Sequence, residues 1–338
     1  MGMQRVLSTI TLFFVLVTCG FIQEAGAGSK QVMKYYCVAP PFSPVNTSME
    51  KMNEFLKKES GGDLEMALFP SGQLGPESQG LNSLKMGAVQ SAAITGVAIS
   101  VLEPKANIMM LPYAFKTWED IETFANSATM ADIGKSLDKK GLKLMGVGGY
   151  GFFNVLSKKN FCTDISDYKG SKIRVYPTPI LIDLYKTLGA SPTPIAFPEI
   201  YTGLQQGVID ATDGTLDSSY ASKQYEIAKY LTRTDHLYGW FLYLVNKRWY
   251  GKLSEKNQIL VRDGFEKYSV IARQETKKYD AKVMKIYAEN GVNVMRLSDE
   301  KRNALLKNTY SIHEKYRDII GADLLDQFYG ELNFKAPL

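Results

Sequence analysis

The chain has 338 residues, enough for one large lobe or two lobes of medium size. Hydrophobic residues make up 45% of it and charged residues 22%, the balance of an ordinary soluble globular protein. The net charge of +5 comes without a long run of Lys or Arg, so the sequence does not indicate a nucleic-acid-binding surface.

Residues 1–27 have the features of a secretory signal peptide. Arg5 precedes an apolar run over residues 6–22, and Ala25-Gly26-Ala27 supplies the small residues of a cleavage site. We expect cleavage after Ala27, which places the mature chain outside the cytoplasm. A retained membrane anchor stays open as an alternative because the apolar run approaches spanning length. A lipid-modified Cys19 is a second alternative.

Two cysteines, Cys37 and Cys162, remain after this cleavage. An oxidising compartment would permit a disulfide between them, but we favour two free buried thiols. No CxxC or Cys/His spacing is present, so the sequence predicts no metal site and no cofactor.

The first half of the chain alternates predicted strands with predicted helices. Strands are expected at 34–38, 64–69, 90–95, 142–147 and 152–157, and helices at 49–59, 78–86 and 118–140. Gly148 and Gly149 are expected to loosen the chain between the last two strands. This alternation predicts α/β layers with largely parallel sheets.

The second half continues the alternation and then becomes mostly helical. Strands are expected at 174–175, 191–195, 208–211 and 238–245, and helices at 179–188, 198–206, 255–290 and 299–320, followed by a short terminal helix.

Arg174 stands alone among apolar residues in the segment IRVYP. Burying a guanidinium group is costly, and arginine cannot lose its proton to avoid the cost. Its planar fork fits a carboxylate held by two hydrogen bonds. We therefore expect Arg174 to face a cleft and bind an anion. An internal salt bridge to an Asp or Glu is the alternative that the strand leaves open.

Three segments resemble one protein family. They are FPSGQLGPE (69–77), KGSKIRV (169–175) and LGASPTPIAFPEIYTGLQQGVID (188–210). In this order they resemble the solute-binding proteins of the tripartite ATP-independent periplasmic (TRAP) transporters, typified by the C4-dicarboxylate binder. The resemblance extends from about Lys34 to about Ser254.

The resemblance implies an α/β, two-lobed periplasmic-binding-protein fold, with mixed sheets, flanking helices and a cleft between the lobes. It places residues 28–150 and about 239–285 in lobe I. Lobe II then holds residues 151–238 and about 286–338. Closure of such lobes on a ligand is a hinge motion. The resemblance also implies capture of a small organic acid by the arginine at position 174.

Two positions depart from the family pattern. Many relatives have an arginine where this chain has Phe153, and many have an asparagine where it has Gly214. Both groups usually help to bind an acidic or polyhydroxylated ligand. We therefore expect a monocarboxylate with an apolar or aromatic body, rather than a dicarboxylate or a sialic-acid-like ligand.

Further ligand contacts are predicted around Arg174. Tyr176 lies two residues away, on the same side of an extended strand. Gln73 and Glu77 belong to the loop that lines the cleft in relatives, although Glu77 could instead be an acid that favours a helix N-terminus. Asp213 is expected to contact ligand or solvent. The remaining predicted ligand-binding residues are Asn154, Phe197, Tyr201 and Trp240.

The segment 146–151 matches GxGxxG, but it leads into a predicted strand and not a helix. We therefore expect no nucleotide site there, and interpret the glycines as a crossover between lobes. His236 and His313 are the two histidines, and no nucleophile motif accompanies either of them in the sequence. A secreted or periplasmic enzyme acting on a small carboxylate, through His236 or Asp213, is the alternative function.

The sequence thus predicts a non-enzymatic, periplasmic solute-binding protein of a TRAP transporter, without cofactor. Its expected partners are a small organic acid and the membrane permease subunits, with no nucleic acid, and a monomer is expected. A sensory binding protein that reports its ligand to a receptor is a further alternative that the sequence does not separate from transport.

Overall fold

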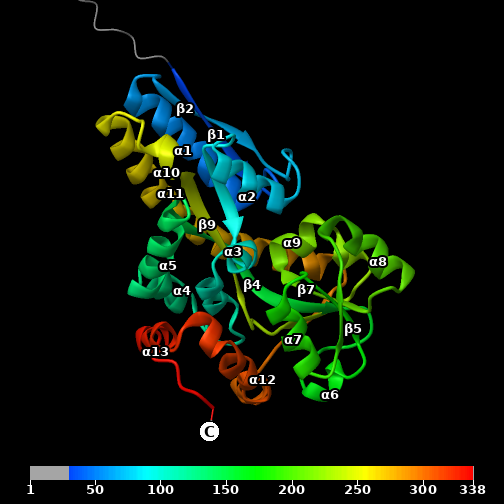
Figure 1. Ribbon diagram of the computed structural model, residues 1–338. Coiled ribbons are helices and arrows are strands. Elements are labelled where there is room, and N and C mark those ends of the chain that lie inside the picture. The colour runs from blue at the N-terminus through cyan, green and yellow to red at the C-terminus, as the bar shows by residue number, and fades with distance from the viewer. Residues whose placement is uncertain (1–29, 338) are drawn as a thin grey trace, which may run out of the picture.

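The computed structural model describes residues 30–337 (Figure 1). The expected signal peptide and Cys19 lie outside the described residues. The strands are β1 (Gln31–Cys37), β2 (Leu64–Phe69), β3 (Ser91–Thr95), β4 (Leu142–Ser157), β5 (Lys172–Val175), β6 (Ser191–Pro194), β7 (Ala211–Thr215), β8 (Tyr230–Arg233), β9 (Tyr238–Asn246) and β10 (Asn293–Arg296).

Helices surround these strands. The α-helices are α1 (Pro44–Ser60), α2 (Glu77–Met86), α3 (Gly96–Leu102), α4 (Trp118–Ala125), α5 (Ala128–Lys139), α6 (Ile165–Tyr168), α7 (Pro179–Thr187), α8 (Ile200–Gln206), α9 (Leu216–Ala221), α10 (Lys247–Tyr250), α11 (Glu255–Glu289), α12 (Asp299–Ile320) and α13 (Ala322–Glu331). Short 3-10 helices are η1 (Pro104–Met110), η2 (Phe197–Glu199) and η3 (Gln224–Glu226). Among residues 30–337, no helix combines the length and the apolar character needed to cross a membrane.

The sheet is mixed and is shared between two halves of the fold. Its order is β2-β1-β3-β9-β4-β7-β5-β6, and β8 pairs with β4 and β10. β4 pairs with β9 over residues 142–152 and with β7 over residues 153–157. Figure 1 shows the blue half with β1 and β2, the green half with β5 and β7, and β4 between them. The predicted α/β class with mixed sheets and flanking helices is therefore confirmed. The expectation of largely parallel sheets was wrong for the central strands, because β4 and β9 are antiparallel to all their partners.

The shared strand β4 is longer than predicted. The sequence predicted two strands separated by Gly148 and Gly149, and this was wrong, because β4 runs unbroken through both. Tyr243 and Tyr238 of β9 lie so close to these two positions that a Cβ would overlap their side chains. The glycines therefore serve the close approach of neighbouring side chains and do not end the strand.

Two other predicted boundaries were wrong. The helix predicted at 118–140 is two helices, because the Ser127 hydroxyl accepts a hydrogen bond from the backbone N–H of Met130 at 3.0 Å and starts α5. The strand predicted at 208–211 lies at Ala211–Thr215, so Asp213 and Gly214 are themselves strand residues. The elements α3, α9, β8 and β10 were not predicted, since segments this short carry little periodicity.

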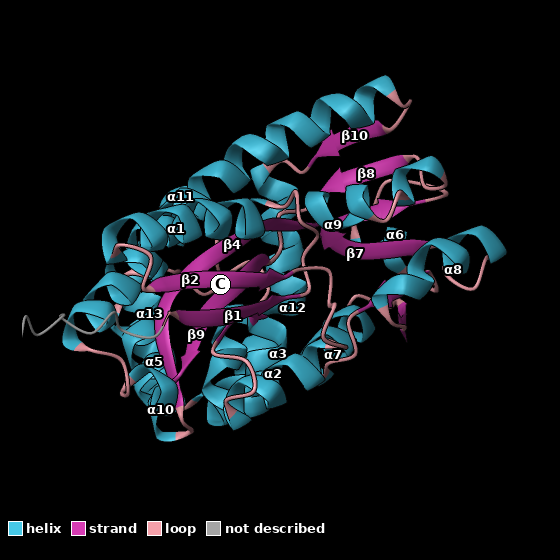
Figure 2. Ribbon diagram, turned by 90° about the horizontal axis from the view of Figure 1, so that it is seen from above, coloured by secondary structure: helices cyan, strands magenta, loops and turns pink. Residues whose placement is uncertain are grey.

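Helix α11 spans both halves of the fold. It has 35 residues and packs on α1 and β4, and further along on α9 and β10 (Figure 2). On its inner face, Arg273 donates to the Val147 carbonyl at 2.6 Å and Thr276 donates to the Gly149 carbonyl at 2.9 Å. These bonds hold the helix along the shared strand.

The two cysteines in the described part of the chain, Cys37 and Cys162, are buried and free, as expected from the sequence. Burial raises the pKa of each thiol to about 12. Because the thiolate is the reactive form, both residues are expected to resist alkylation in the folded protein.

The C-terminal helices hold a buried histidine. α12 and α13 pack on η1, α4 and α5 and also on α7, and thus on segments of both expected lobes. His313 of α12 is 1% exposed, with Nε2 2.8 Å from the Pro112 carbonyl oxygen and Nδ1 2.8 Å from the Tyr329 hydroxyl. Burial lowers the pKa of His313 to about 4.

This depressed pKa predicts an acid-sensitive contribution to stability. Between the folded pKa and the unfolded pKa of about 6.5 the unfolded chain binds more protons, so the contribution is lost as pH falls through this window. In the wild type we expect His313 to lower the free energy of unfolding by roughly 2 kcal/mol between about pH 7 and about pH 5. The His313→Gln protein should not show this decrease. Urea unfolding of both proteins at the two pH values measures it. An equal acid-induced loss in His313→Gln would contradict the assignment.

Candidate ligand-binding site

Arg174 is buried in β5 without a charged partner. It is 7% exposed, and its Nε donates to the Ile195 carbonyl at 3.2 Å. Its terminal guanidinium nitrogens have no hydrogen-bond or ion-pair partner within residues 30–337. These nitrogens are not completely buried, so a ligand can reach them. Burial lowers the pKa of Arg174 to about 10, an effect that the nearby charge of Asp213 partly offsets. The described residues therefore do not form the internal salt bridge that was the alternative.

Asp213 lies near enough to Arg174 for its charge to act on the guanidinium, and it contacts His236. The Asp213 side chain is 0% exposed, and its Oδ1 is 3.2 Å from the Nε2 of His236. The other ring nitrogen, Nδ1, is 2.7 Å from the Thr234 hydroxyl, and the Tyr185 hydroxyl is 3.4 Å from Nε2. The sequence drew attention to Asp213 and His236 separately. The sequence gave no signal that these two side chains touch, because β7 and the segment before β9 are brought together by their shared neighbour β4.

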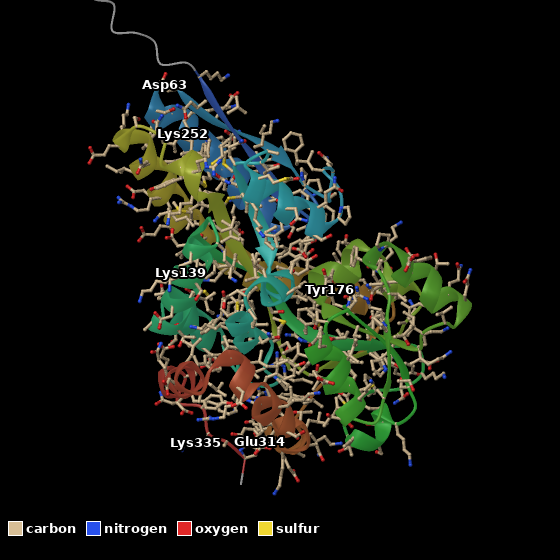
Figure 3. All side chains as sticks on the ribbon, viewed as in Figure 1. Asp63, Lys139, Tyr176, Lys252, Glu314 and Lys335 are labelled. Carbon is tan, nitrogen blue, oxygen red and sulfur yellow. The ribbon has the colours of Figure 1, made fainter. Side chains whose placement is uncertain are left out.

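Tyr176 and Glu77 bring the two halves of the fold together beside Arg174. Glu77 begins α2, and its carboxylate accepts hydrogen bonds from the Thr95 backbone N–H and hydroxyl at 2.7 and 2.8 Å. Burial raises the pKa of Glu77. Burial and the charge of Glu77 raise the pKa of Tyr176 to about 12. Figure 3 shows Tyr176 between the cyan and green parts of the chain. Glu77 thus occupies the helix-terminal position that was the alternative, and its contact with a ligand stays a prediction.

Phe153 and Gly214, the positions that depart from the family pattern, lie on adjacent rungs of one strand pair. The pairing of β4 with β7 sets Phe153 opposite Thr215, Asn154 opposite Gly214, and the next residue opposite Asp213. The Phe153 ring is half-buried, 6.3 Å from the ring of His236. Asn154 is 2% exposed, and its side-chain amide donates to the carbonyl of Phe152, two residues earlier on β4, at 2.8 Å. Asn154 therefore supports the strand.

Trp240 does not join this group. It was predicted to bind ligand, but it is 1% exposed and packs against Phe115 and Phe124, with ring centroids 5.5 and 5.1 Å away. Because β9 is buried along its whole length, its large side chains belong to the core.

Three further predicted residues lie nearer the surface. The Tyr201 hydroxyl donates to Glu226 at 3.0 Å. Phe197 is 42% exposed, and Gln73 is exposed in the loop before α2. Among residues 30–337, no hydrogen bond or ion pair joins any of these three to Arg174. Asp213 and Tyr176 act electrostatically on Arg174, and Glu77 acts on Tyr176. Phe153 and Gly214 lie on the neighbouring strand pair of β4 and β7.

Two surface pockets, of about 510 and 200 Å³, contain none of the predicted ligand-binding residues. Within residues 30–337, no three His, Cys, Asp or Glu side chains are grouped so that they could hold a metal ion. The chemistry available around Arg174 is therefore that of a buried cation flanked by phenol, carboxyl and aromatic groups.

Residues 37–318 match the bacterial extracellular solute-binding protein family 7, DctP. The C4-dicarboxylate-binding periplasmic protein DctP of Rhodobacter capsulatus is 28% identical over 308 residues, covering 87% of this chain and 89% of the relative. These matches run through nearly all of the described chain.

Solved structures agree with this assignment. A TRAP periplasmic solute-binding protein from Ochrobactrum anthropi, with its C-terminus bound in the ligand-binding pocket, has a TM-score of 0.86 and 26% identity, covering 90% of this chain and 95% of the other. Another from Desulfovibrio salexigens, with bound orotic acid, has a TM-score of 0.84 and 26% identity, covering 90% and 99%.

The matched proteins are periplasmic solute-binding proteins and not enzymes, so the alternative of a secreted enzyme is not upheld. Proteins of this kind bind small organic acids and work with membrane permease subunits. The family-wide match and the two-lobed fold together show that the chain belongs to the DctP family of TRAP transporter solute-binding proteins.

Proposed function

We propose that this protein captures a small monocarboxylate through Arg174 and delivers it to its membrane permease. The observation that carries the proposal is a buried guanidinium whose terminal nitrogens have no protein partner among the described residues. A buried charge needs a partner, and a carboxylate matches the two free nitrogens in charge and geometry.

Closure of the lobes would strengthen this pairing. The carboxylate replaces water around Arg174, and exclusion of the remaining water lowers the effective dielectric constant around the pair. Tyr176 and Glu77 lie where the two halves meet, so their contact changes as the halves move. Binding and closure are therefore coupled.

The body of the ligand is proposed to be flat and apolar or aromatic. Phe153 offers a ring where many relatives offer a second cation, and Gly214 offers no side chain to hydrogen-bond a hydroxyl group. The orotic acid bound by the Desulfovibrio salexigens protein carries a single carboxylate on a flat ring. The Rhodobacter capsulatus relative, named for C4-dicarboxylates, represents the other ligand class in the family.

The proposal includes the cellular setting of the protein. Cleavage after Ala27 releases a monomer into the periplasm. The lobes divide where β4 changes partners, so that 28–150 with about 239–285 form one lobe and 151–238 with about 286–338 form the other.

A thermal-shift panel tests the proposal. The protein is unfolded and refolded to remove bound ligand, then melted with orotate, benzoate, succinate or glucuronate. A ligand that binds only the folded state raises the melting temperature. We expect orotate or benzoate to raise it in the wild type and in Arg248→Ala, an exposed arginine that serves as control, but not in Arg174→Ala. A response to succinate or glucuronate alone would refute the ligand class, and an equal response in Arg174→Ala would refute the clamp.

Phe153→Arg is expected to change the ligand class. A second guanidinium beside the site offers a partner for a second carboxylate, so succinate affinity should rise by about 10-fold or more. Isothermal titration calorimetry measures the change. Phe153→Leu, which removes the ring without adding charge, should gain nothing for succinate. If Phe153→Arg binds succinate no better than Phe153→Leu does, position 153 does not select the ligand.

A further inference from the structure

The chain passes between the two halves of the fold at an irregular point of β4. The register of β4 with β9 shifts between Gly149 and Phe152, and from Phe153 onward β4 pairs with β7. Gly151, inside the irregularity, has a φ of 91°, a value that favours glycine. A strand that changes partners at such a point can act as a hinge between the two halves.

Asp280 of α11 lies directly against this hinge. A Cβ at position 151 would be 2.9 Å from one Asp280 carboxylate oxygen. Asp280 is 5% exposed, and neither of its oxygens has a hydrogen-bond partner. Arg273 and Thr276, earlier on the same helix, each donate to a carbonyl of β4. Asp280 continues this row of polar side chains but lacks a bond of its own.

A second buried carboxylate joins the halves nearby. Asp217 of α9 is 2% exposed, and its Oδ2 accepts a hydrogen bond from the Ser43 hydroxyl at 2.7 Å, while its Oδ1 has no partner. Ser43 precedes α1 in the half that contains β1, whereas α9 follows β7 in the other half. α9 packs on α11, which carries Asp280.

The charges around these two carboxylates do not neutralise them. Arg233 faces Asp280 but is bound to Asp235 at 3.0 Å, and Asp235 adds negative charge of its own. Burial raises the pKa of Asp280 to about 7 and that of Asp217 to about 6, and the Asp217 charge contributes to the first shift. The other titratable groups that face the pair are the phenols of Tyr150, Tyr238, Tyr279 and Tyr287.

We propose that Asp280 and Asp217 form a proton-sensitive contact at the hinge between the two lobes. As neutral acids, both remain buried where the chain crosses from one lobe to the other. After losing their protons they repel each other and gain from hydration, and the described arrangement gives way to one with the lobes further apart. The contact lies outside the group around Arg174, so the proposal does not depend on which acid the protein binds.

Distance measurements between the lobes test this without any ligand. Nitroxide labels are attached at Lys169→Cys and Lys252→Cys, two exposed positions in different halves, while Cys37 and Cys162 are buried. Double electron–electron resonance then gives the label separation at about pH 5.5 and about pH 8.5, on either side of the proposed titration. Asp280→Asn removes the ionisable group with little change in shape. Asp263→Asn is the control, since Asp263 is an exposed acid on the same helix, paired with Arg262.

We expect the wild type and Asp263→Asn to shift toward longer separations at the higher pH, and Asp280→Asn to keep the separation seen at low pH. An unchanged wild type, or an Asp280→Asn protein that shifts like the wild type, would overturn the proposal. If Asp280→Asn does not fold, Asp217→Asn provides the same test. Its change in label separation between the two pH values should be smaller than that of the wild type, and an equal change would count against the proposal.

Discussion

Replacing Arg174 with alanine is expected to weaken carboxylate binding by at least about 100-fold, roughly 3 kcal/mol. The loss is large because the ligand carboxylate would then be buried without a positive partner. Arg174 has no ion-pair partner among the described residues, so its removal should leave the fold with few broken contacts. Isothermal titration calorimetry with the acid that gives the largest thermal shift measures the effect.

Two variants show whether charge or shape causes this loss. Arg174→Lys keeps the charge but loses the planar fork, so its affinity for the carboxylate should lie between those of the wild type and Arg174→Ala. Arg248→Ala removes an exposed arginine and should bind as the wild type does. Equal affinities for Arg174→Ala and Arg248→Ala would show that Arg174 does not hold the ligand.

Trp240→Ala is expected to lower the free energy of unfolding by about 3–5 kcal/mol. Trp240 is 1% exposed and fills the space between Phe115, Phe124 and Tyr238, so the substitution leaves a cavity in the core. Urea unfolding measures the loss. Binding should fall only insofar as the protein unfolds.

Phe197→Ala is the matched control for this prediction. Phe197 is also an aromatic residue that the sequence assigned to the ligand, but it is 42% exposed. Its replacement should change stability by no more than about 0.5 kcal/mol. A Trp240→Ala protein with wild-type stability but weakened binding would return Trp240 to the ligand site.

The elements that the sequence predicted well are those whose pattern is local. The strand at 64–69 and the helix at 299–320 have the predicted bounds, because alternation and helical periodicity are strong there and turn or capping residues flank them. An anion-binding role for Arg174 was inferred because burying a lone arginine in an apolar strand costs free energy. Its burial without an ion pair among the described residues speaks against an internal salt bridge, and anion binding stays a prediction.

What the sequence could not provide depends on pairing between distant segments. The contact between Asp213 and His236 requires the register of β4 with its neighbours, which no local pattern encodes. Asp217 and Asp280 look like ordinary helix-surface acids in the sequence, and only the packing of α9 and α11 on each other, on β4 and beside Ser43 buries them. Trp240 was wrongly assigned to the ligand because an apolar strand that is buried on both faces does not indicate which of its side chains border a site.

A crystal structure of the protein with the monocarboxylate that produces the largest thermal shift would show whether Arg174 holds the ligand. We expect both oxygens of the ligand carboxylate to lie within hydrogen-bond distance of the terminal nitrogens of Arg174, with the body of the ligand beside Phe153. A bound acid that makes no contact with Arg174, or an Arg174 that pairs with Asp213 while the ligand is held by other residues, would contradict it.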